Sequence, residues 1–465
     1  MFPEKFIKRI KGQEYSDANE LLKALEDPSP VSIRTNPLKW DKLPSGCESV
    51  PWCKSGYYLE KRPSFTLDPL FHGGCYYPQE ASGMFMEHVY KQTVRDIKEI
   101  KVLDLCGAPG GKSTHLSSMI GKNGFVVAND VIRARALILA ENLTKWGLSN
   151  TIVTQNDPAA FNRLQGFFDL ILVDAPCSGE GMFRDQVAVT EWSEDNTLLC
   201  SDRQKRILID VWPALKENGI LIYSTCTFNP DENEKNIKWL TEKHEAESVI
   251  LNISDYKGIT EIDHLGIKGY GFYPGKIRGE GLFISVIRKA GSTWSVRTGK
   301  TDSSERKISR DERKIADDLT DFKDNCLLRI NDEISSIPCS YNDYALISKY
   351  LKVIRPGTKI CTLKRKNYIP SHELAMSVYL KNSVYSTLNL NLQQALNYLR
   401  RENLSVSGAQ TGWIMAAYQD VKLGFLNNIG NRMNNYYPVE WRIRMRASEN
   451  ESENLIRWTG NSRYS

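Results

Sequence analysis

The sequence lacks a hydrophobic segment of membrane-spanning length, since no window approaches about 18 apolar residues. It also lacks the apolar run of a secretory signal peptide in the residues that follow Met1. We therefore expect no membrane partner and a cytoplasmic location. Hydrophobic residues make up 41 % of the chain and charged residues 25 %, as in ordinary globular proteins. At 465 residues the chain is long enough for about three domains.

Paired cysteines are absent as well. The ten cysteines are scattered without a Cys-x-x-Cys pair, and the six histidines are isolated from one another. These patterns are typical neither of a disulfide framework nor of a zinc site, so the sequence predicts no metal. In a reducing compartment the thiols stay free. We expect most of them to be small buried apolar residues and a few to be available for chemistry.

A strong overall charge is also lacking, because the net charge is only +5. Its distribution is uneven. Residues 341–465 contain 17 lysines and arginines and eight acidic residues, a net charge of +9, so the rest of the chain is mildly acidic. A basic C-terminal third on an acidic body indicates an appendage that binds a polyanion. Its charges and stacking faces would come from Lys364, Arg365, Lys366, Arg432, Arg442, Arg444, Arg446, Tyr436, Tyr437 and Trp441. The alternative is a solvated basic face with the aromatic rings in a local core.

Short apolar runs alternate with helical patterns through the middle of the chain. Strands are predicted at 102–105, 125–128, 151–153, 168–173 and 219–224, and helices at 112–120, 133–146 and 199–215. This alternation predicts an α/β fold with a parallel sheet covered on both faces. Near the C-terminus, two short strands at 413–418 and 422–425 predict a small β-rich domain.

A glycine-rich turn joins the first of these strands to the first helix. It consists of Cys106, Gly107, Ala108, Pro109, Gly110, Gly111 and Lys112. Glycines allow close approach of a ligand to the backbone, and the helix that follows offers free N–H groups. A phosphate-binding P-loop would need a glycine at the position of Cys106, and Gly107 is one residue too close to the Gly-Lys-Ser end. The spacing therefore disfavours a P-loop nucleotidase and favours a nucleoside cofactor.

Two acidic residues stand where such a cofactor would need them. Asp130 follows the second strand, about 20 residues after the glycine turn, and is placed to accept hydrogen bonds from ribose hydroxyls. Asp157 follows the third strand and is placed to accept from an adenine amino group. The alternative for both residues is a helix cap.

Two further strand ends carry reactive side chains. Asp174-Ala-Pro-Cys177-Ser-Gly follows one strand, and Ser224-Thr-Cys226-Thr ends another. Because the carboxyl ends of parallel strands form the crevice of an open α/β sheet, these side chains should meet beside the nucleoside. A magnesium-binding role for Asp174 would leave both cysteines unexplained.

Methylation of a cytosine at carbon 5 would use this set of groups. Carbon 5 is a poor nucleophile until a thiolate adds to carbon 6, after which it can attack a sulfonium methyl group. A carboxyl group near N3 favours the addition, and a proton acceptor must then take the carbon-5 proton so that the thiol can leave. The site must also activate the thiol, because a free thiol is mostly protonated at pH 7. The residues alone do not rank Cys177 and Cys226.

The two-cysteine motifs at 174–179 and 224–227, together with the glycine turn at 106–112, resemble those of the Sun/Fmu-type RNA cytosine-5 methyltransferases. Segments 33–36, 77–80 and 281–283 look like other parts of the same family. Segments 370–375 and 430–438 look like the bacterial RsmF subfamily, which acts on 16S ribosomal RNA. The resemblance covers nearly the whole chain.

This resemblance implies roles for the matched residues. The 106–112 turn, Asp130, Asp157 and Asp174 would contact S-adenosyl-L-methionine. Cys226 would be the nucleophile, Cys177 would assist release, and Asp174 would also serve catalysis. RsmF-like sequences often carry Glu at the position of Asp130, so its ribose contact could shift slightly. The expected partner is RNA, 16S rRNA within the small ribosomal subunit, bound by a monomer.

The resemblance also implies the domain order. We expect an N-terminal ferredoxin-like α/β extension at 1–75, a Rossmann-like methyltransferase domain at 76–290 and a charged linker at 291–315. A mixed α/β RNA-binding domain at 316–400 and a PUA-like RNA-binding domain at 401–465 would follow. A different hypothesis is a non-catalytic RNA-binding assembly factor with the same fold, against which the presence of both cysteines argues.

Overall fold

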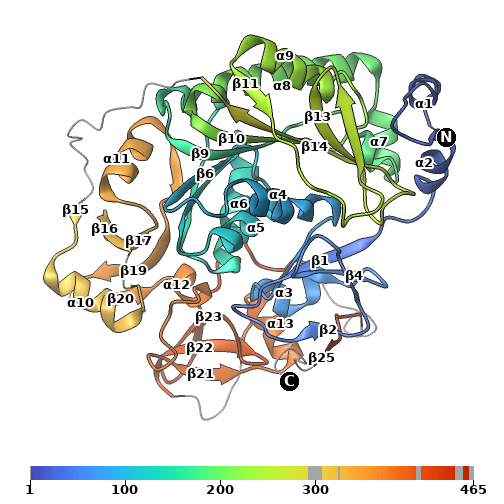
Figure 1. Ribbon diagram of the computed structural model, residues 1–465. Helices are drawn as coiled ribbons and strands as arrows, with labels where there is room; N and C mark the ends of the chain where they lie inside the picture. Colours follow the sequence, from blue (N-terminus) through green and yellow to red (C-terminus); the bar gives the residue numbers. More distant parts are fainter. Residues whose placement is uncertain are drawn as a thin grey trace.

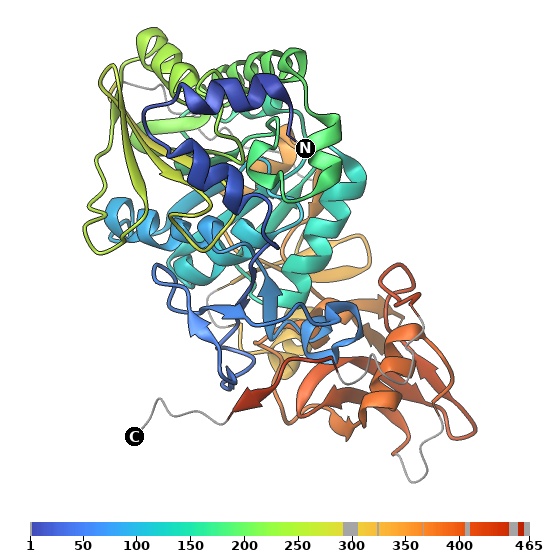
Figure 2. The same cartoon turned by 90° about the vertical axis from the view of Figure 1, so that its right-hand side faces the viewer.

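The computed structural model describes residues 2–291, 306–322, 325–365, 367–404, 410–445 and 454–459 (Figure 1). One long sheet lies in the middle of the molecule, and smaller sheets lie around it (Figure 1, Figure 2). Among these residues, no helix is long and apolar enough to cross a membrane.

The central sheet carries the parallel strands that the sequence predicts. Its members are β6 (Ile100–Asp104), β7 (Gly124–Asn129), β8 (Thr151–Thr154), β9 (Phe168–Asp174), β10 (Leu215–Thr225), β11 (Ala246–Ser248), β12 (Thr260–His264), β13 (Ile267–Phe272), β14 (Leu282–Lys289) and β18 (Val353–Arg355). They lie in the order β12-β13-β14-β10-β9-β6-β7-β8-β18, with β11 beside β14. Strands β6 to β10 are parallel, and β14 is antiparallel to β10. Since β6 lies between β7 and β9, the strand order reverses there and a crevice opens at the carboxyl ends of β6 and β9.

Helices cover both faces of this sheet. The two sets are α4 (Met86–Thr93), α5 (Gly111–Ile120) and α6 (Arg133–Trp146) on one face, and α8 (Glu194–Val211) and α9 (Glu234–Lys243) on the other. Successive strand residues point to opposite faces, so Val102 packs with Leu116 of α5, whereas Leu103 belongs to the cluster that contains Leu208 of α8. Both faces are therefore apolar, which explains the nearly continuous hydrophobic runs of the strands.

Helix α8 differs from its prediction at both ends. It begins at Glu194, where Ser193 caps it by accepting from the Asn196 N–H, and ends at Val211. A 3-10 turn containing Pro213 follows, and β10 already starts at Leu215 with an irregular register before Ile220. The predicted helix extended to 215 because its apolar spacing continues past a proline, which cannot continue an α-helix.

The N-terminal extension contains two helices followed by an antiparallel sheet. Its elements are α1 (Glu4–Lys11), α2 (Ala18–Ala24), β1 (Val31–Thr35), β2 (Leu43–Pro44), β3 (Glu48–Ser49), β4 (Gly56–Leu59), α3 (Pro69–His72) and β5 (Tyr76–Pro78). The sheet has the order β3-β4-β1-β5, while β2 pairs with β25 (Trp458–Thr459) from the other end of the chain. Both long helices precede β1, so the element order differs from the β-α-β-β-α-β pattern of a ferredoxin-like fold.

A second small sheet follows the charged segment. Its region contains β15 (Arg306–Lys307), α10 (Arg310–Leu319), β16 (Cys326–Ile330), β17 (Glu333–Ile337), α11 (Tyr341–Tyr350), β19 (Thr358–Lys364), β20 (Asn367–Pro370) and α12 (His372–Met376). Of the predicted linker 291–315, residues 292–305 lie outside the described residues, but residues 310–315 form the start of α10. A capping box between Ser309 and Glu312 begins this helix, and the high charge of the segment concealed it.

The C-terminal sheet contains the two strands predicted near 413 and 422. Its elements are β21 (Ser386–Asn389), α13 (Leu392–Arg400), β22 (Gly412–Tyr418), β23 (Val421–Asn428) and β24 (Met433–Asn435), in the order β21-β22-β23-β24. Because β21 pairs with β22 and α13 packs in the same core, the predicted boundary at 400 cuts through this unit.

Candidate active site

A cavity of about 540 Å³ opens at the carboxyl ends of β6, β9 and β10. One wall is the segment 77–80 of the N-terminal extension. Another is the segment 280–282 at the start of β14. Of the predicted site residues, the cavity is lined by Cys106, Gly107, Ala108, Pro109, Gly111, Lys112, Asp174 and Cys226. Its volume lies in the range of roughly 300–1,000 Å³ that is usual for small-molecule sites.

The glycine turn forms the floor of this cavity. Gly110 has a φ of 119° and is the residue before α5, a backbone conformation that favours glycine. At Gly107 a Cβ atom would lie 2.7 Å from Ser113 Oγ, so a side chain has no room there. The Gly107 N–H donates to the Asn129 carbonyl oxygen at 2.7 Å, which ties the turn to the end of β7.

Lys112 and Asp174 form an ion pair beside the cavity. Lys112 Nζ lies 2.8 Å from Asp174 Oδ2, and Ser224 Oγ donates to the other carboxylate oxygen at 2.6 Å. Burial alone would lower the pKa of Lys112, but Asp174, Asp104 and Cys226 together raise it. The lysine is therefore a fixed positive charge in the neighbourhood of the Cys226 thiol.

The two cysteines meet, as their positions at neighbouring strand ends predict. Cys177 Sγ lies 2.8 Å from Cys226 Sγ, and the Cys226 N–H donates to Cys177 Sγ at 3.1 Å. The contact with Cys226, together with burial, raises the pKa of the Cys177 thiol well above its ordinary value. Cys226 lines the cavity, whereas Cys177 lies behind it. A molecule in the cavity would thus meet Cys226 first.

Glu232 holds the loop that carries Cys177. Its carboxylate accepts from the Ser178 N–H at 2.9 Å, from Ser178 Oγ at 2.5 Å and from Gln204 Nε2 at 3.0 Å. Burial raises its pKa to about 7, although these hydrogen bonds oppose the shift. The sequence analysis missed this residue, which lies beyond the second cysteine motif.

Asp104 is a second residue that the sequence analysis missed. It ends β6, is fully buried and lines the cavity. Ser113 Oγ donates to Asp104 Oδ2 at 2.6 Å, but Oδ1 has no hydrogen-bond partner among the described residues. Burial raises its pKa to about 7, and the negative charge of Asp174 adds to the effect. Its position directly before the glycine turn, at a strand end, was the available signal.

Asp130 and Asp157 lie at their predicted strand ends but do not line the cavity. Asp130 is buried, accepts from the Ile132 N–H at 2.9 Å and lies 3.3 Å from Arg135. Asp157 is exposed, caps a 3-10 helix through the Ala159 N–H and lies 3.3 Å from Arg206. Asp157 therefore makes the capping contact of the alternative interpretation, whereas α6 has no side-chain cap and Asp130 only precedes it; the cofactor contacts of both residues stay predictions.

Three family models match the chain. The model of the 16S rRNA methyltransferase RsmB/F matches residues 93–288. The N-terminal domain of 16S rRNA methyltransferase RsmF matches residues 2–81, and the methyltransferase RsmF PUA domain matches residues 385–443. The chain belongs to the RsmF family of 16S rRNA methyltransferases. The predicted combination of a Rossmann-like methyltransferase domain, an N-terminal extension and a PUA-like domain is thereby confirmed.

Individual relatives agree with this family. Ribosomal RNA small subunit methyltransferase F of Shewanella oneidensis is 29 % identical over 450 residues, which cover 90 % of this chain and 92 % of that protein. The protein of the same name from Aliivibrio fischeri is 28 % identical and covers 94 % of this chain and 97 % of its own length. A solved methyltransferase homolog from Pyrococcus horikoshii is 30 % identical, with a TM-score of 0.52, over 62 % of this chain and 95 % of that chain.

The RsmF PUA domain carries part of the predicted RNA-binding surface. Arg432, Arg442 and Arg444 are exposed, as the sequence analysis expects. Tyr437, however, is buried in the domain core, with 1 % of its surface exposed, and the prediction of a free stacking face is wrong for this residue. Tyr436 is 38 % exposed and packs edge-on against Trp413. The neighbouring residues Tyr436 and Tyr437 thus face the surface and the domain core, respectively.

Proposed function

We propose that this chain transfers a methyl group from S-adenosyl-L-methionine to carbon 5 of a cytosine in 16S rRNA of the small ribosomal subunit. The observation that carries this proposal is the contact between Cys226 and Cys177, whose sulfur atoms lie 2.8 Å apart beside the Lys112–Asp174 ion pair. One thiol and a carboxylate that line a nucleoside-sized cavity, with a second thiol in contact with the first, fit cytosine C5 chemistry. Transfer to a ring nitrogen or a ribose oxygen has no use for a thiol nucleophile.

The floor of the cavity fits the proposed cofactor. Asp104 Oδ1 is a buried acceptor without a partner among the described residues, and the methionine ammonium group of S-adenosyl-L-methionine would satisfy it. The turn at Gly107 leaves no room for a side chain and keeps the backbone close to a ligand. When bound, this cofactor supplies an electrophilic methyl group on a sulfonium sulfur. Asp130 would serve its ribose and Asp157 its adenine, in place of their present contacts with the Ile132 and Ala159 N–H groups.

Cys226 is placed to attack the target base, because its side chain lines the cavity. Its thiolate forms a bond to carbon 6, and the proton that the thiol gives up passes through the Asp174 carboxyl group to N3, which neutralises the charge that the ring gains. The positive charge of Lys112 stabilises the Cys226 thiolate. After carbon 5 has taken the methyl group, water accepts the carbon-5 proton, the C6–S bond breaks to return the Cys226 thiolate, and N3 gives its proton back. Cys177, 2.8 Å from Cys226 Sγ, is placed to assist this release.

The substrate assignment rests on the relatives and on the outer domains. The two curated relatives are named small subunit methyltransferases, and the three family models describe RsmB/F or RsmF. Exposed arginines of the PUA domain can contact phosphates. We expect the chain to act on RNA as a monomer. Tritium transfer to small subunits, large subunits and transfer RNA would test the substrate, and labelling of transfer RNA alone would contradict it.

The division of labour between the two thiols gives the sharpest test. Cys226→Ala should abolish methyl transfer and form no covalent species. Cys177→Ala should attach to RNA and methylate it but release it slowly, so a protein–RNA adduct should accumulate under denaturing electrophoresis. Cys47→Ser is a matched control, because Cys47 is a half-buried cysteine outside the cavity. An adduct in Cys226→Ala and none in Cys177→Ala would reverse the roles. Full activity in both variants, with no adduct, would mean that the thiols are structural.

A further inference from the structure

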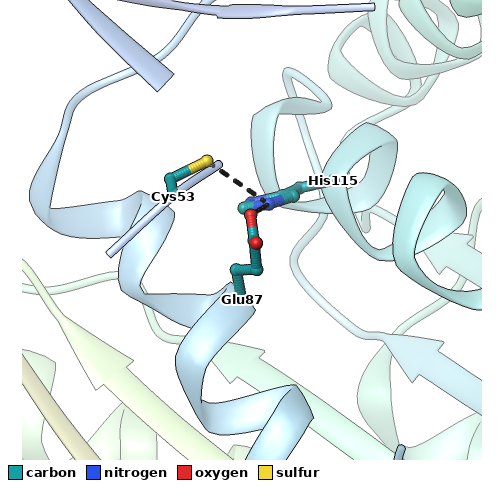
Figure 3. A group of neighbouring side chains, drawn as sticks. All are labelled: Cys53, Glu87 and His115. Carbon is teal, nitrogen blue, oxygen red and sulfur yellow. Dashed lines mark hydrogen bonds and ion pairs between the residues drawn. The ribbon is translucent and has the colours of Figure 1, made fainter. Parts of the chain in front are cut away.

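A second group of reactive side chains lies away from the cavity, at the seam between the N-terminal extension and the helices of the methyltransferase domain. It consists of Cys53, Glu87 and His115, all buried (Figure 3). Cys53 lies in the turn before β4, Glu87 in the first turn of α4 and His115 in the middle of α5. The three side chains point toward one another in Figure 3. Cys53 and Glu87 are 34 positions apart in the sequence, and Glu87 and His115 are 28 positions apart, so no short sequence motif predicts the cluster.

The distances within this cluster suit a metal ion. His115 Nε2 lies 3.8 Å from Cys53 Sγ and 3.3 Å from Glu87 Oε2, and the three ligand atoms all lie within 4.8 Å of one another. With metal–ligand lengths of about 2.3 Å to sulfur and about 2.0–2.2 Å to nitrogen and oxygen, a tetrahedral centre separates its ligands by about 3.4–3.6 Å. Small side-chain movements would therefore bring all three atoms into one coordination sphere.

We propose that Cys53, Glu87 and His115 bind a zinc ion. A thiolate, an imidazole and a carboxylate are ligand types that zinc accepts together, whereas magnesium and calcium prefer oxygen alone. A water molecule can supply the fourth ligand, because Glu87 and His115 also line a separate cavity of about 730 Å³ on the outer side of the cluster. The cavity at the strand ends and this separate cavity have no lining residue in common.

The surroundings hold the carboxylate ligand in place, while His115 Nδ1 has no hydrogen-bond partner among the described residues. Glu87 Oε1 pairs with Lys91 Nζ at 2.5 Å, and the Lys54 N–H donates to Glu87 Oε2 at 3.3 Å, so the carboxylate is held in place. Burial and the nearby Arg34 lower the pKa of His115 to about 4, which leaves its ring neutral and free to bind. On binding, the Cys53 thiol gives its proton to solvent and a Zn–S bond forms. One thiolate and one carboxylate then balance the two charges of Zn²⁺.

Such an ion would fasten the extension to the catalytic domain. Cys53 belongs to the segment that matches the RsmF N-terminal domain, while His115 lies one turn after Lys112 on the helix that follows the glycine turn. Arg34 already bridges the same elements, since its side chain donates to Thr114 Oγ1 at 2.6 Å and to Gln79 Oε1 at 2.9 Å. Zinc should therefore stabilise the folded chain by mass action without touching the methyl-transfer site.

The test uses the full chain without a polyhistidine tag, in a Cys177→Ser/Cys226→Ser background that removes the other close pair of thiols. After treatment with a chelator, titration with Zn²⁺ should show one ion per chain and a melting temperature that rises with zinc concentration. Cys53→Ser should weaken this binding by at least about 100-fold, the scale on which metal sites respond to altered shells. Cys47→Ser, a change at a half-buried cysteine of the same extension, should not. With Co²⁺ as the probe, a thiolate-to-cobalt absorption band should appear in the background protein and be absent in Cys53→Ser.

Two results would overturn the proposal. One is that the background protein binds no stoichiometric zinc. The other is that Cys53→Ser and Cys47→Ser bind zinc equally, or show the same cobalt spectrum. If Cys53→Ser does not give a native circular dichroism spectrum, Glu87→Gln in the same background provides the comparison while Cys53 is retained. Methyl transfer is measured separately in the wild-type chain, so failure of this proposal leaves the proposed function standing.

Discussion

Two clusters of this protein, one partly exposed and one buried, contain similar kinds of side chain in opposite settings. The cavity cluster consists of Asp104, Lys112, Asp174, Cys177 and Cys226, and the seam cluster of Cys53, Glu87 and His115. The cavity cluster lies at the carboxyl ends of parallel strands, where side chains meet beside an open cavity. The seam cluster lies between packed elements, with the three side chains facing one another.

The carboxylates show what this difference does. Burial raises the pKa of Asp104 to about 7, the negative charge of Asp174 adds to the effect, and one of the Asp104 oxygens has no partner among the described residues. Burial acts on Glu87 in the same direction, but His115 and Lys91 outweigh it and lower its pKa. The open strand edge thus leaves a carboxylate oxygen without a partner, whereas the packed seam pairs its carboxylate with a lysine and an imidazole. Unsatisfied groups indicate where a substrate or cofactor binds.

The largest expected contrast is in thiol reactivity. Burial raises the pKa of Cys53 to about 12, which leaves about 1,000-fold less thiolate at neutral pH than an ordinary thiol has. Cys226 lines an open cavity and should react with iodoacetamide at least about 100-fold faster. Mass spectrometry of peptides after timed alkylation of the native chain would measure both rates, with the denatured chain as control. Equal native rates would erase the distinction between the clusters.

Removal of the cavity cation should have the next largest effect. Lys112→Met deletes the charge that pairs with Asp174 and lies near Cys226, and it should lower single-turnover methyl transfer by about 100-fold or more, as loss of an electrostatic stabiliser does. Lys122→Met is the matched control, because Lys122 is an exposed lysine just after the same helix. Activity of Lys112→Met close to that of the control would remove the lysine from the mechanism.

The two carboxylates should give opposite pH dependences of stability. Asp104 holds its proton in the folded chain up to about pH 7 but loses it near pH 4 when unfolded, so it destabilises the fold increasingly from about pH 4 to 7. Asp104→Asn should therefore raise the free energy of unfolding by roughly 2–3 kcal/mol more at pH 8 than at pH 5. Glu87 has a lowered pKa, so its stabilisation is present above about pH 4.5 and is lost as pH falls further.

Urea denaturation of wild type, Asp104→Asn and Glu87→Gln at pH 5 and pH 8 would measure this contrast. Glu87→Gln should be less stable than wild type at both pH values. If Asp104→Asn lowers stability at pH 8 as well, the carboxylate is ionised and paired in the folded chain, and the contrast between the two clusters is lost.

The smallest effect should come from a region that contacts neither cluster. Replacing Arg432, Arg442 and Arg444 together by alanine should weaken RNA binding by about 10-fold and reduce the salt slope by up to about 2, since each phosphate contact to a single strand contributes about 0.7. Single-turnover methyl transfer at saturating RNA should stay unchanged. Lys8, Lys11 and Lys314, which are exposed elsewhere, form the control triple. The same salt slope for both triples would mean that the PUA arginines do not contact RNA.

The sequence predicts every member of the cavity cluster except Asp104, because these residues stand at or after the ends of strands that the apolar pattern reveals. Cys177 and Cys226 could be placed together from the rule that parallel strand ends share an edge. Asp130 and Asp157 followed the same rule, yet their side chains turn to nearby backbone N–H groups, and strand position alone does not determine that choice. The seam cluster could not be predicted from the sequence, because its three residues meet only through tertiary packing.

The same limit applies to the fold. Helix α6 was predicted with its observed bounds, Arg133–Trp146, because a regular apolar period ends at a glycine in the left-handed region, Gly147. Helix α10 was missed because charge dominates it, and only its capping box marks its start. Strand β18 could not have been assigned to the central sheet, since it is short and lies about 200 residues after its partner β8.

That pairing of β18 with β8 has a consequence during protein synthesis. The strand β8 leaves the ribosome long before Val353 and Arg355, which complete its outer hydrogen bonds. At about 5–20 residues per second, an interval of about 200 residues leaves this edge open for roughly 10–40 seconds. An uncovered strand edge can pair with another chain, so every nascent copy passes through a period of exposure to neighbours on the same messenger. Slowing elongation between the two strands should lengthen this period. Crowding of ribosomes on one messenger should then increase pairing of the open edge with neighbouring nascent chains.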